Sequence, residues 1–433
     1  MSVHSSNSIA QVQYPAPEIR CSVRRPAVGT AWSFGALVAF LALLYSQLPL
    51  LLPALEEFRV VYVVGGTAML VVVVERMLAR REFEFVWPES YLLFGFVVVA
   101  GLSCFDAIWM HYAVENTLNL IKMASLYFII INAVSNIAKL RNVIWVMVVG
   151  GLFPALGALW NYSQGIQIEG RAYWVGIFMN PNELAYSLVI LIPLAVSLAA
   201  TGSRRSASVF WLFSALYVAS IYLSFSRGGM LGLLAVLALA GLRWKSTAAR
   251  TVTFVLLVGA LVWIAYGWSR QEGFDQLATD ATVHQRFETI RAGLAMFVDH
   301  PMFGVGLGSS VVAWPLYASS AAYGGKWLII HNTFMQVLSE TGITGFLLFG
   351  LLLATAIHDA WTIGKNSRIQ QTQAATLATG LELSLWAFVV CGLSGGFALT
   401  WFPYILIGLV AALKKIATEP SFASTSPMRT RPG

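Results

Sequence analysis

Four basic residues in separate polar stretches are the ones best suited to chemistry in this chain. The stretches contain Arg171 in NYSQGIQIEGRAYWVGIFMNPNEL, Arg227 in YLSFSRGGML, Arg286 in TVHQRFETIRAGLAMFVDH, and His331 in IIHNTFMQVLSETGITG. Guanidinium groups bind phosphate oxygens through paired hydrogen bonds, and a neutral imidazole can serve as a general base. The set indicates chemistry on a phosphate or diphosphate with an acceptor that must lose a proton.

Arg227 interrupts an apolar run from Val209 to Leu242. A charge at the bilayer centre costs roughly 3 kcal/mol or more, so we expect Arg227 in a tight connection at a membrane surface. Gly228 and Gly229 would permit a turn with positive φ and let a backbone or ligand approach closely. An arginine that merely reaches lipid headgroups is the alternative, and position alone does not decide between the two.

The stretch around Arg171 is a loop rich in glycine and aromatic residues. Asn180, Pro181 and Glu183 fit the N-cap, first-turn proline and capping-box carboxylate of the helix that follows. Glu183 is therefore expected to be a cap rather than a catalytic acid. Arg171 has no such local role, so a ligand contact and a lipid-headgroup contact both remain open.

Residues 269–330 form a hydrophilic stretch far longer than a connection requires, and such loops are usually functional. Apolar residues recur there at helical spacing: Val283, Phe287, Ile290, Leu294, Phe297 and Val298. The spacing predicts an amphipathic helix ended by Pro301, with Arg286 pointing inward if the apolar stripe packs on the bundle. The helix would be a lid or a plain surface helix. The glycines of HPMFGVGLGSS are expected to form a tight loop, since no strand precedes them.

His331 and Asn332 precede the next apolar span. At a helix N-terminus near arginines, the positive field disfavours protonation of the imidazole, although a lone histidine is more often structural. Glu340 would lie on the opposite side of that helix. No close carboxylate pair is available to hold a divalent cation against a diphosphate, since Asp275 and Asp280 are too far apart. We therefore expect no metal and no cofactor, with arginines stabilising the developing charge.

The composition of the chain indicates which kind of structural elements position these residues. The chain has 433 residues, 58% hydrophobic and 11% charged, with a mean hydropathy of +0.72, which indicates an all-α polytopic membrane protein. The net charge of +7 does not indicate nucleic acid, because the basic residues are scattered. Cys21, Cys104 and Cys391 lack the spacing of a disulfide framework or zinc site.

About twelve membrane-spanning helices of about 20 residues are expected. They lie near 31–52, 60–78, 90–109, 117–134, 143–160, 183–200, 209–225, 229–242, 251–268, 333–357, 374–391 and 396–413. The division of the chain follows from these spans: an N-terminal segment 1–30, helices over 31–268, an outer loop 269–331, helices over 332–414, and a disordered tail 415–433.

The orientation follows from the distribution of the basic residues. Most of the 27 lysines and arginines fall in alternate connections, which are therefore expected to be cytoplasmic. Both termini would be cytoplasmic, and Arg171, Arg227 and Arg286 would share the outer side.

The SFSRGG hairpin, the long outer loop with HPMFGVGLG, and HNTFMQVLSETGITG resemble, in this order and spacing, the O-antigen ligase superfamily. The family also includes O-antigen and exopolysaccharide polymerases and protein O-oligosaccharyltransferases. The resemblance implies a twelve-helix bundle related to the GT-C glycosyltransferases. It would act without metal on undecaprenyl diphosphate glycans at the periplasmic leaflet of the bacterial inner membrane. The family's functional arginines fall on Arg227, Arg286 and Arg171, and its histidine on His331.

We therefore expect a ligase that transfers a whole glycan from undecaprenyl diphosphate to a sugar hydroxyl of lipid A core, with inversion. The arginines would hold the diphosphate, and His331 would remove or orient the acceptor proton. The expected partners are this donor, this acceptor and membrane lipids, but no nucleic acid. A polymerase or oligosaccharyltransferase would differ in acceptor, while a glycan transporter or a noncatalytic assembly subunit belongs to another class.

Overall fold

The computed structural model describes residues 31–243, 246–266, 281–319, 327–366 and 373–418. The expected N-terminal segment, most of the expected tail, both aspartates named above and parts of the outer loop lie outside the described residues. Throughout the described ranges the protein is helical, with one isolated bridge between Ile168 and Arg171 and no strand. The all-α prediction is confirmed.

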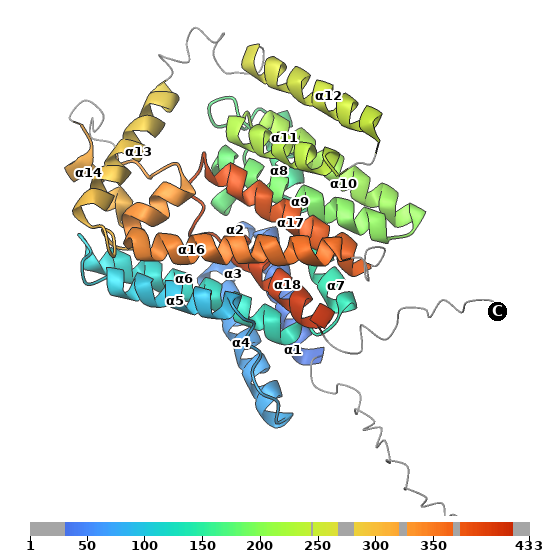
Figure 1. Cartoon of the computed structure of the whole chain (residues 1–433), viewed down its shortest axis with the longest axis horizontal. Coiled ribbons are helices and arrows are strands. Elements are labelled where there is room, and N and C mark those ends of the chain that lie inside the picture. Colours follow the sequence, from blue (N-terminus) through green and yellow to red (C-terminus); the bar gives the residue numbers. More distant parts are fainter. Residues whose placement is uncertain (1–30, 244–245, 267–280, 320–326, 367–372, 419–433) are drawn as a thin grey trace, which may run out of the picture.

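The helices follow one another through connections of varied length (Figure 1). Those of the first half are α1 (Ala31–Ser46), α2 (Leu48–Leu51), α3 (Pro53–Glu57), α4 (Val60–Leu78), α5 (Glu89–Ser103), α6 (Met110–Ala133), α7 (Ile137–Gly150), α8 (Leu152–Ser163), η1 (Gly176–Met179) and α9 (Pro181–Thr201). Those of the second half are α10 (Arg204–Leu223), α11 (Arg227–Gly241), α12 (Thr247–Tyr266), α13 (Ala281–Asp299), α14 (Ser310–Tyr317), α16 (Thr333–Lys365), α17 (Gln373–Gly392) and α18 (Trp401–Thr418).

The described part of the chain has 8 helices long and apolar enough to cross a membrane: α4, α6, α7 continued by α8, α9, α10, α16, α17 and α18. Shorter apolar helices cover the remaining predicted spans: α1, α5, α11 and a part of α12. The protein is thus a multi-pass membrane protein by length and composition of its helices. The total of twelve spans remains a prediction.

Several predicted spans differ from the helices by five or more residues at one or both ends, the first and the last among them. The first ends at Ser46 instead of continuing to 52, because Gln47 adopts a left-handed conformation with φ of 53°. Two separate short helices follow, with Pro49 in the first turn of α2 and Pro53 at the start of α3. The last begins at Trp401, because residues 393–400 form a connecting segment between α17 and α18.

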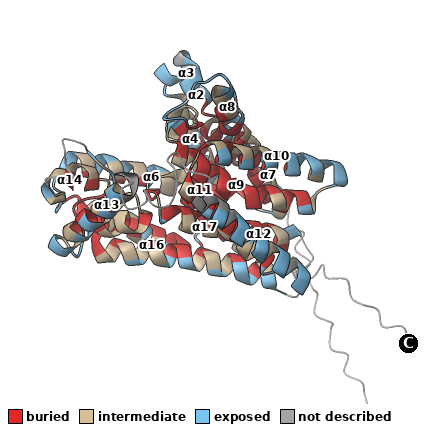
Figure 2. Cartoon of the chain, turned by 90° about the horizontal axis from the view of Figure 1, so that it is seen from above, coloured by how far each residue is buried: buried red, intermediate tan, exposed pale blue. Residues whose placement is uncertain are grey.

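The central helix is α9, which is buried along nearly its whole length and packs against α7, α10, α11 and α17 (Figures 1 and 2). Small residues permit the close approach of these helices. A Cβ at Gly232 of α11 would lie 2.4 Å from Cys391 Sγ of α17, and one at Gly380 of α17 would lie 2.8 Å from Ser197 Oγ of α9. Such positions are typical of helix packing in membranes, where van der Waals contact drives association.

The helix α16 is broken at Gly342, whose φ of 65° is left-handed. The loop 300–310 supplies the backbone partners that the break requires: Ile343 N–H donates to Pro301 O at 2.8 Å, and Val305 N–H donates to Ser339 O at 2.9 Å. Unpaired backbone groups are costly in a membrane, so a broken helix needs such partners. Three glycines of this loop have positive φ, Gly304, Gly306 and Gly308, which confirms the predicted tight loop.

Candidate functional site

The N-terminal ends of α9, α11 and α16 meet at one end of the bundle, which we call the site face. The connecting segment 393–400 joins them. Thr333 Oγ1, at the start of α16, donates to Gly395 O at 2.7 Å and accepts from Phe397 N at 2.8 Å. Asn332 caps α16 through Oδ1, while its Nδ2 donates to Leu393 O at 3.1 Å. The start of α16, and so His331, is fixed to this segment.

Tyr186, one turn into α9, contacts the same segment. Its hydroxyl donates to Ser394 O at 3.0 Å and lies 2.9 Å from Ser394 Oγ. Its ring packs edge-on against Phe397, with ring centroids 5.2 Å apart. Tyr186 is therefore a buried link between the central helix and the site face.

Gly228 and Gly229 do not make a turn with positive φ, as the sequence predicted. They lie in the first turn of α11, and the positive φ of the hairpin, 47°, falls on Phe225. Side chains, instead of the predicted backbone or ligand, lie close to both glycines. A Cβ at Gly228 would lie 2.0 Å from Ser394 Oγ and 2.5 Å from the Tyr186 hydroxyl, and one at Gly229 would lie 2.6 Å from Ala185 Cβ.

Arg227 is the first residue of α11 and is half-buried. Its helix is capped by Ser226, whose Oγ accepts from Gly229 N at 3.2 Å. Arg227 thus lies at a helix end, away from the middle of a span, as predicted. The partial positive charge of the helix N-terminus adds to its own charge, which favours an anion there.

Arg171 is buried and joins its loop to the two neighbouring helices. Nε donates to Ser224 O at 2.6 Å and Nη2 donates to Asn182 Oδ1 at 2.6 Å. The next residue continues the attachment, with Ala172 N–H donating to Leu223 O at 2.9 Å. A side chain only 6% exposed with these partners is not a lipid-headgroup contact. It holds the loop against the hairpin that carries Arg227.

The helix predicted around Arg286 forms as α13, but its buried face is not the predicted apolar stripe. Phe287, Leu294 and Val298 are exposed, while the buried residues are Thr289, Ala292, Gly293 and Met296. A Cβ at Gly293 would lie 2.8 Å from Ile330 Cδ1. Small residues face the bundle because large side chains would keep α13 away from the start of α16.

Arg286 lies on this buried face, one turn before Thr289 and two before Gly293. Its Nε is buried and has no hydrogen-bond partner among the described residues. The same guanidinium interacts electrostatically with Tyr186 of α9 and with His331. Arg286 therefore points toward the bundle, as predicted. The face of α13 that packs on the bundle, however, is not the predicted apolar stripe.

His331 is half-buried directly before α16. Its pKa lies below the ordinary value of 6.5, first because burial disfavours the charged imidazole and second because Arg286 repels the added proton. Neither ring nitrogen has a hydrogen-bond partner in the part of the chain that the structure describes. The imidazole is a neutral base near pH 7 with both nitrogens available to a ligand.

Glu340 does not orient His331, in agreement with the sequence. It is buried, and its carboxylate accepts from Gly308 N at 2.8 Å and from Ser310 Oγ at 2.5 Å, which fixes the loop 300–310. At α9, Asn180 is the predicted N-cap and accepts from Asn182 N at 2.9 Å. Within the described ranges, however, Glu183 makes no capping-box bond to Asn180 N–H.

Sequence reasoning missed Tyr186, Ser394 and Thr333, which are the buried connections of the site face. The sequence signal for this segment is the triplet SGG at 394–396, a glycine-rich stretch at the start of the predicted span 396–413. No group of three metal-ligating side chains occurs among the residues with described positions.

The family comparison covers the part of the chain that contains most of this site. Residues 212–350 match the family model described as O-antigen ligase. The matched region spans the hairpin with Arg227, α13 with Arg286, and His331, but not Arg171. A search of curated proteins finds no match. The match confirms the resemblance to the O-antigen ligase superfamily over residues 212–350, within a chain that the lengths and composition of its helices make a multi-pass membrane protein.

Proposed function

We propose that the protein is an O-antigen ligase, which transfers a glycan from undecaprenyl diphosphate to a sugar hydroxyl of lipid A core. The observation that carries this proposal is that α13 places Arg286 within electrostatic reach of His331, inside the segment matched by the family model. One cation for a leaving diphosphate and one neutral base for an acceptor hydroxyl are thereby neighbours. Transfer to a hydroxyl requires both.

In the proposed reaction, Arg227 and Arg286 bind the diphosphate of the donor, and Arg171 adds a third positive charge. The acceptor oxygen forms a bond to the anomeric carbon from the face opposite the diphosphate. The bond between that carbon and the diphosphate oxygen breaks, so the configuration is inverted and undecaprenyl diphosphate leaves. His331 removes the acceptor proton or orients the hydroxyl. Arginines compensate the charge that develops on the leaving oxygen.

The proposed orientation follows from the same assignment. The site face would lie at the periplasmic surface of the bacterial inner membrane, and both termini would lie in the cytoplasm. The chain would be divided into the segments 1–30, 31–268, 269–331, 332–414 and 415–433. The bundle would belong to the GT-C type of glycosyltransferases. The loop 300–310 and α13 would form the structured part of the periplasmic loop.

An O-antigen polymerase or a protein O-oligosaccharyltransferase would use the same donor chemistry with another acceptor. A glycan transporter would move the lipid without forming a glycosidic bond. These functions are distinguished by their products.

The test uses purified full-length protein in lipid nanodiscs with EDTA and undecaprenyl diphosphate glycan. Lipid A core, a lipid-linked glycan or an acceptor protein is added separately, and the products are analysed by gel electrophoresis and mass spectrometry. We expect transfer to lipid A core that disappears in His331→Ala and persists in His284→Ala, a matched control at an exposed position of α13. Elongation of the lipid-linked glycan would instead identify a polymerase, and movement without a product would identify a transporter.

A further inference from the structure

A pocket of about 430 Å³ lies at the opposite end of the bundle from the site face, between the C-terminal ends of α4, α6 and α18. Arg76 and Lys415 line it from α4 and α18, and residues 81–84 line it from the connection between α4 and α5. The helix α18 runs from Trp401, beside the connecting segment 393–400, to Lys415 at the pocket. At 1.5 Å per residue, this places the pocket roughly 20 Å from the site face. It is separate from the proposed ligase site.

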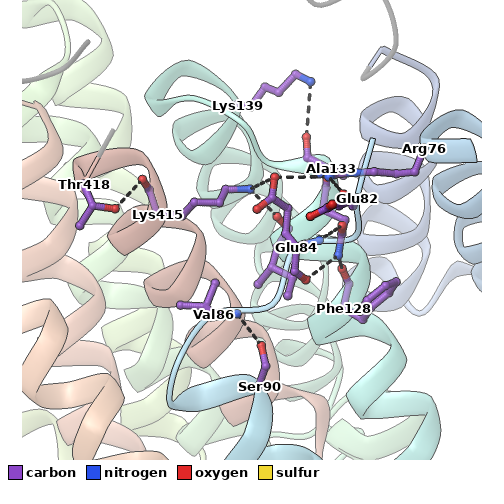
Figure 3. A network of polar contacts seen from close by, with 12 residues as sticks. Arg76, Glu82, Glu84, Val86, Ser90, Phe128, Ala133, Lys139, Lys415 and Thr418 are labelled. Carbon is purple, nitrogen blue, oxygen red and sulfur yellow. Dashed lines mark hydrogen bonds and ion pairs between the residues drawn. The ribbon is translucent and has the colours of Figure 1, made fainter. Parts of the chain in front are cut away.

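Hydrogen bonds between distant segments fix the wall of the pocket (Figure 3). Arg76 Nη1 donates to Glu82 O at 2.5 Å and lies 3.3 Å from Glu84 Oε1, and its Nη2 donates to Asn132 O at 3.0 Å. Glu84 N–H donates to Asn132 Oδ1 at 2.9 Å. Lys415 Nζ donates to Ile131 O at 2.7 Å and lies 4.0 Å from Glu84 Oε1. The pocket is therefore preformed.

The charges of the lining are mixed. Arg76, Arg81 and Lys415 are cationic, and Glu82 and Glu84 are anionic. A simple anion would face two carboxylates, and a simple cation would face three basic groups. A ligand with a phosphate and a primary ammonium a few bonds apart satisfies both kinds of group. A primary ammonium also donates hydrogen bonds to carboxylates, which a quaternary ammonium cannot do.

Two of these side chains are directly available to bind a ligand. Arg81 and Glu82 are exposed, and their side chains have no partner among the described residues. They are consecutive in the lining of the pocket, so one can take a phosphate while the other takes an ammonium. Arg76 and Glu84, which also line the pocket, are paired with each other.

The surroundings place the pocket at the level of lipid headgroups. Phe85, Trp87 and Tyr91 follow it along the chain and are 61%, 71% and 55% exposed. Aromatic side chains in such numbers are typical of the border between hydrocarbon and water. Basic pockets between helix ends at this level bind phospholipid headgroups.

We propose that this pocket binds the headgroup of an aminophospholipid, a phosphodiester that carries a primary ammonium. Arg81, with the field of Lys415 and Arg76, binds the phosphate. Glu82 and Glu84 bind the ammonium. The acyl chains lie along Phe85, Trp87 and Tyr91. The site holds a structural or regulatory lipid and is independent of the reaction at the site face.

The test compares lipids of one acyl composition on purified full-length protein: phosphatidylethanolamine, phosphatidylcholine and phosphatidylglycerol. Native mass spectrometry measures how much of each lipid stays bound. We expect phosphatidylethanolamine to be retained about threefold more than the other two, the factor that one partly exposed ion pair contributes. Arg81→Ala should lower this retention, and Glu82→Gln should remove the preference over phosphatidylglycerol.

Arg80→Ala is the matched control, because Arg80 is exposed and adjacent but does not line the pocket. Equal retention of phosphatidylcholine would overturn the proposal, because it would show that the ammonium is not recognised. Stronger retention of phosphatidylglycerol, or an effect of Arg80→Ala equal to that of Arg81→Ala, would overturn it as well. Full displacement of the lipid by soluble glycerophosphoethanolamine would assign the pocket to a soluble ligand instead.

Discussion

The imidazole of His331 at the start of α16 has a pKa that is lowered first by burial and second by the positive charge of Arg286 on α13. The two residues come from parts of the chain separated by the loop 300–310 and α14. In the proposed mechanism, Arg286 would thus serve twice, because its charge would stabilise the leaving diphosphate and also disfavours protonation of His331.

Replacing Arg286 by glutamine is expected to raise the pKa of His331, because the repelling charge is removed. In the wild type the imidazole is neutral above a pKa that lies below 6.5. The transfer rate should therefore rise with pH through that pKa and be flat near pH 7. In Arg286→Gln the acidic limb of kcat/KM should move to higher pH, together with a general loss of rate.

The control for this experiment is Arg291→Gln, since Arg291 lies on the same helix with its side chain 77% exposed. Its pH profile should match that of the wild type. The imidazole pKa can also be measured directly by NMR of labelled histidine, without turnover. An unchanged His331 pKa in Arg286→Gln would contradict the interaction.

Tyr186→Phe removes the hydroxyl that links α9 to Ser394 without removing the ring contact with Phe397. A buried carbonyl then loses its donor, which costs about 1 kcal/mol. We expect the protein to fold, with a raised KM for the lipid-linked donor, because the hairpin of Arg227 packs on this hydroxyl. Tyr91→Phe, at an exposed tyrosine, is the control. An unchanged donor KM would show that Tyr186 only supports the fold.

Gly228→Ala places a methyl group 2.0 Å from Ser394 Oγ and 2.5 Å from the Tyr186 hydroxyl, so neighbouring atoms must move. The displacement of the hairpin should reduce transfer and lower the unfolding temperature, with a cost of about 1–3 kcal/mol. Gly350→Ala is the matched control, because nothing lies within 4 Å of a Cβ at this position of α16. Equal activity and stability of the two variants would refute the packing role of Gly228.

Glu340→Ala removes the carboxylate that accepts from Gly308 N–H and Ser310 Oγ in the buried loop 300–310. Two donors lose their partner, each at a cost of about 1–3 kcal/mol. We expect a clear loss of stability in a thermal denaturation assay, and accelerated proteolysis within residues 300–310. Glu115→Ala, at an exposed position of α6, should change neither. A stable, protease-resistant Glu340→Ala protein would contradict this assignment.

Arg171→Lys separates a charge effect from a positioning effect. Lysine keeps the positive charge but cannot reproduce two directed bonds to Ser224 O and Asn182 Oδ1. Because these bonds fix the loop against the hairpin of Arg227, we expect Arg171→Lys to lose nearly as much transfer activity as Arg171→Ala. Activity of the lysine variant close to wild type would mean that Arg171 acts through its charge on the diphosphate.

Much of the helical framework was predictable, because hydropathy alone reveals apolar runs long enough for a membrane. The position of Arg227 at a helix end followed from the cost of burying its charge. The buried face of α13 could not be predicted from the sequence in the same way. The helical spacing of apolar residues predicts a buried stripe only where apolar side chains face the protein, whereas Thr289 and Gly293 are buried in α13 and Phe287 is exposed. Tyr186 was not recognised because its partner Ser394 is 208 residues away in sequence.

The break at Gly342 divides α16 into two segments with different attachments. The first segment, which follows His331, is held by Asn332, Thr333 and the connecting segment, and the second packs on α5 and α17. A bilayer of another thickness changes the tilt of a long spanning helix. The loop 300–310 is hydrogen-bonded to both segments beside the glycine, so a change in tilt of the second segment would reach the imidazole through this loop as well as along the helix.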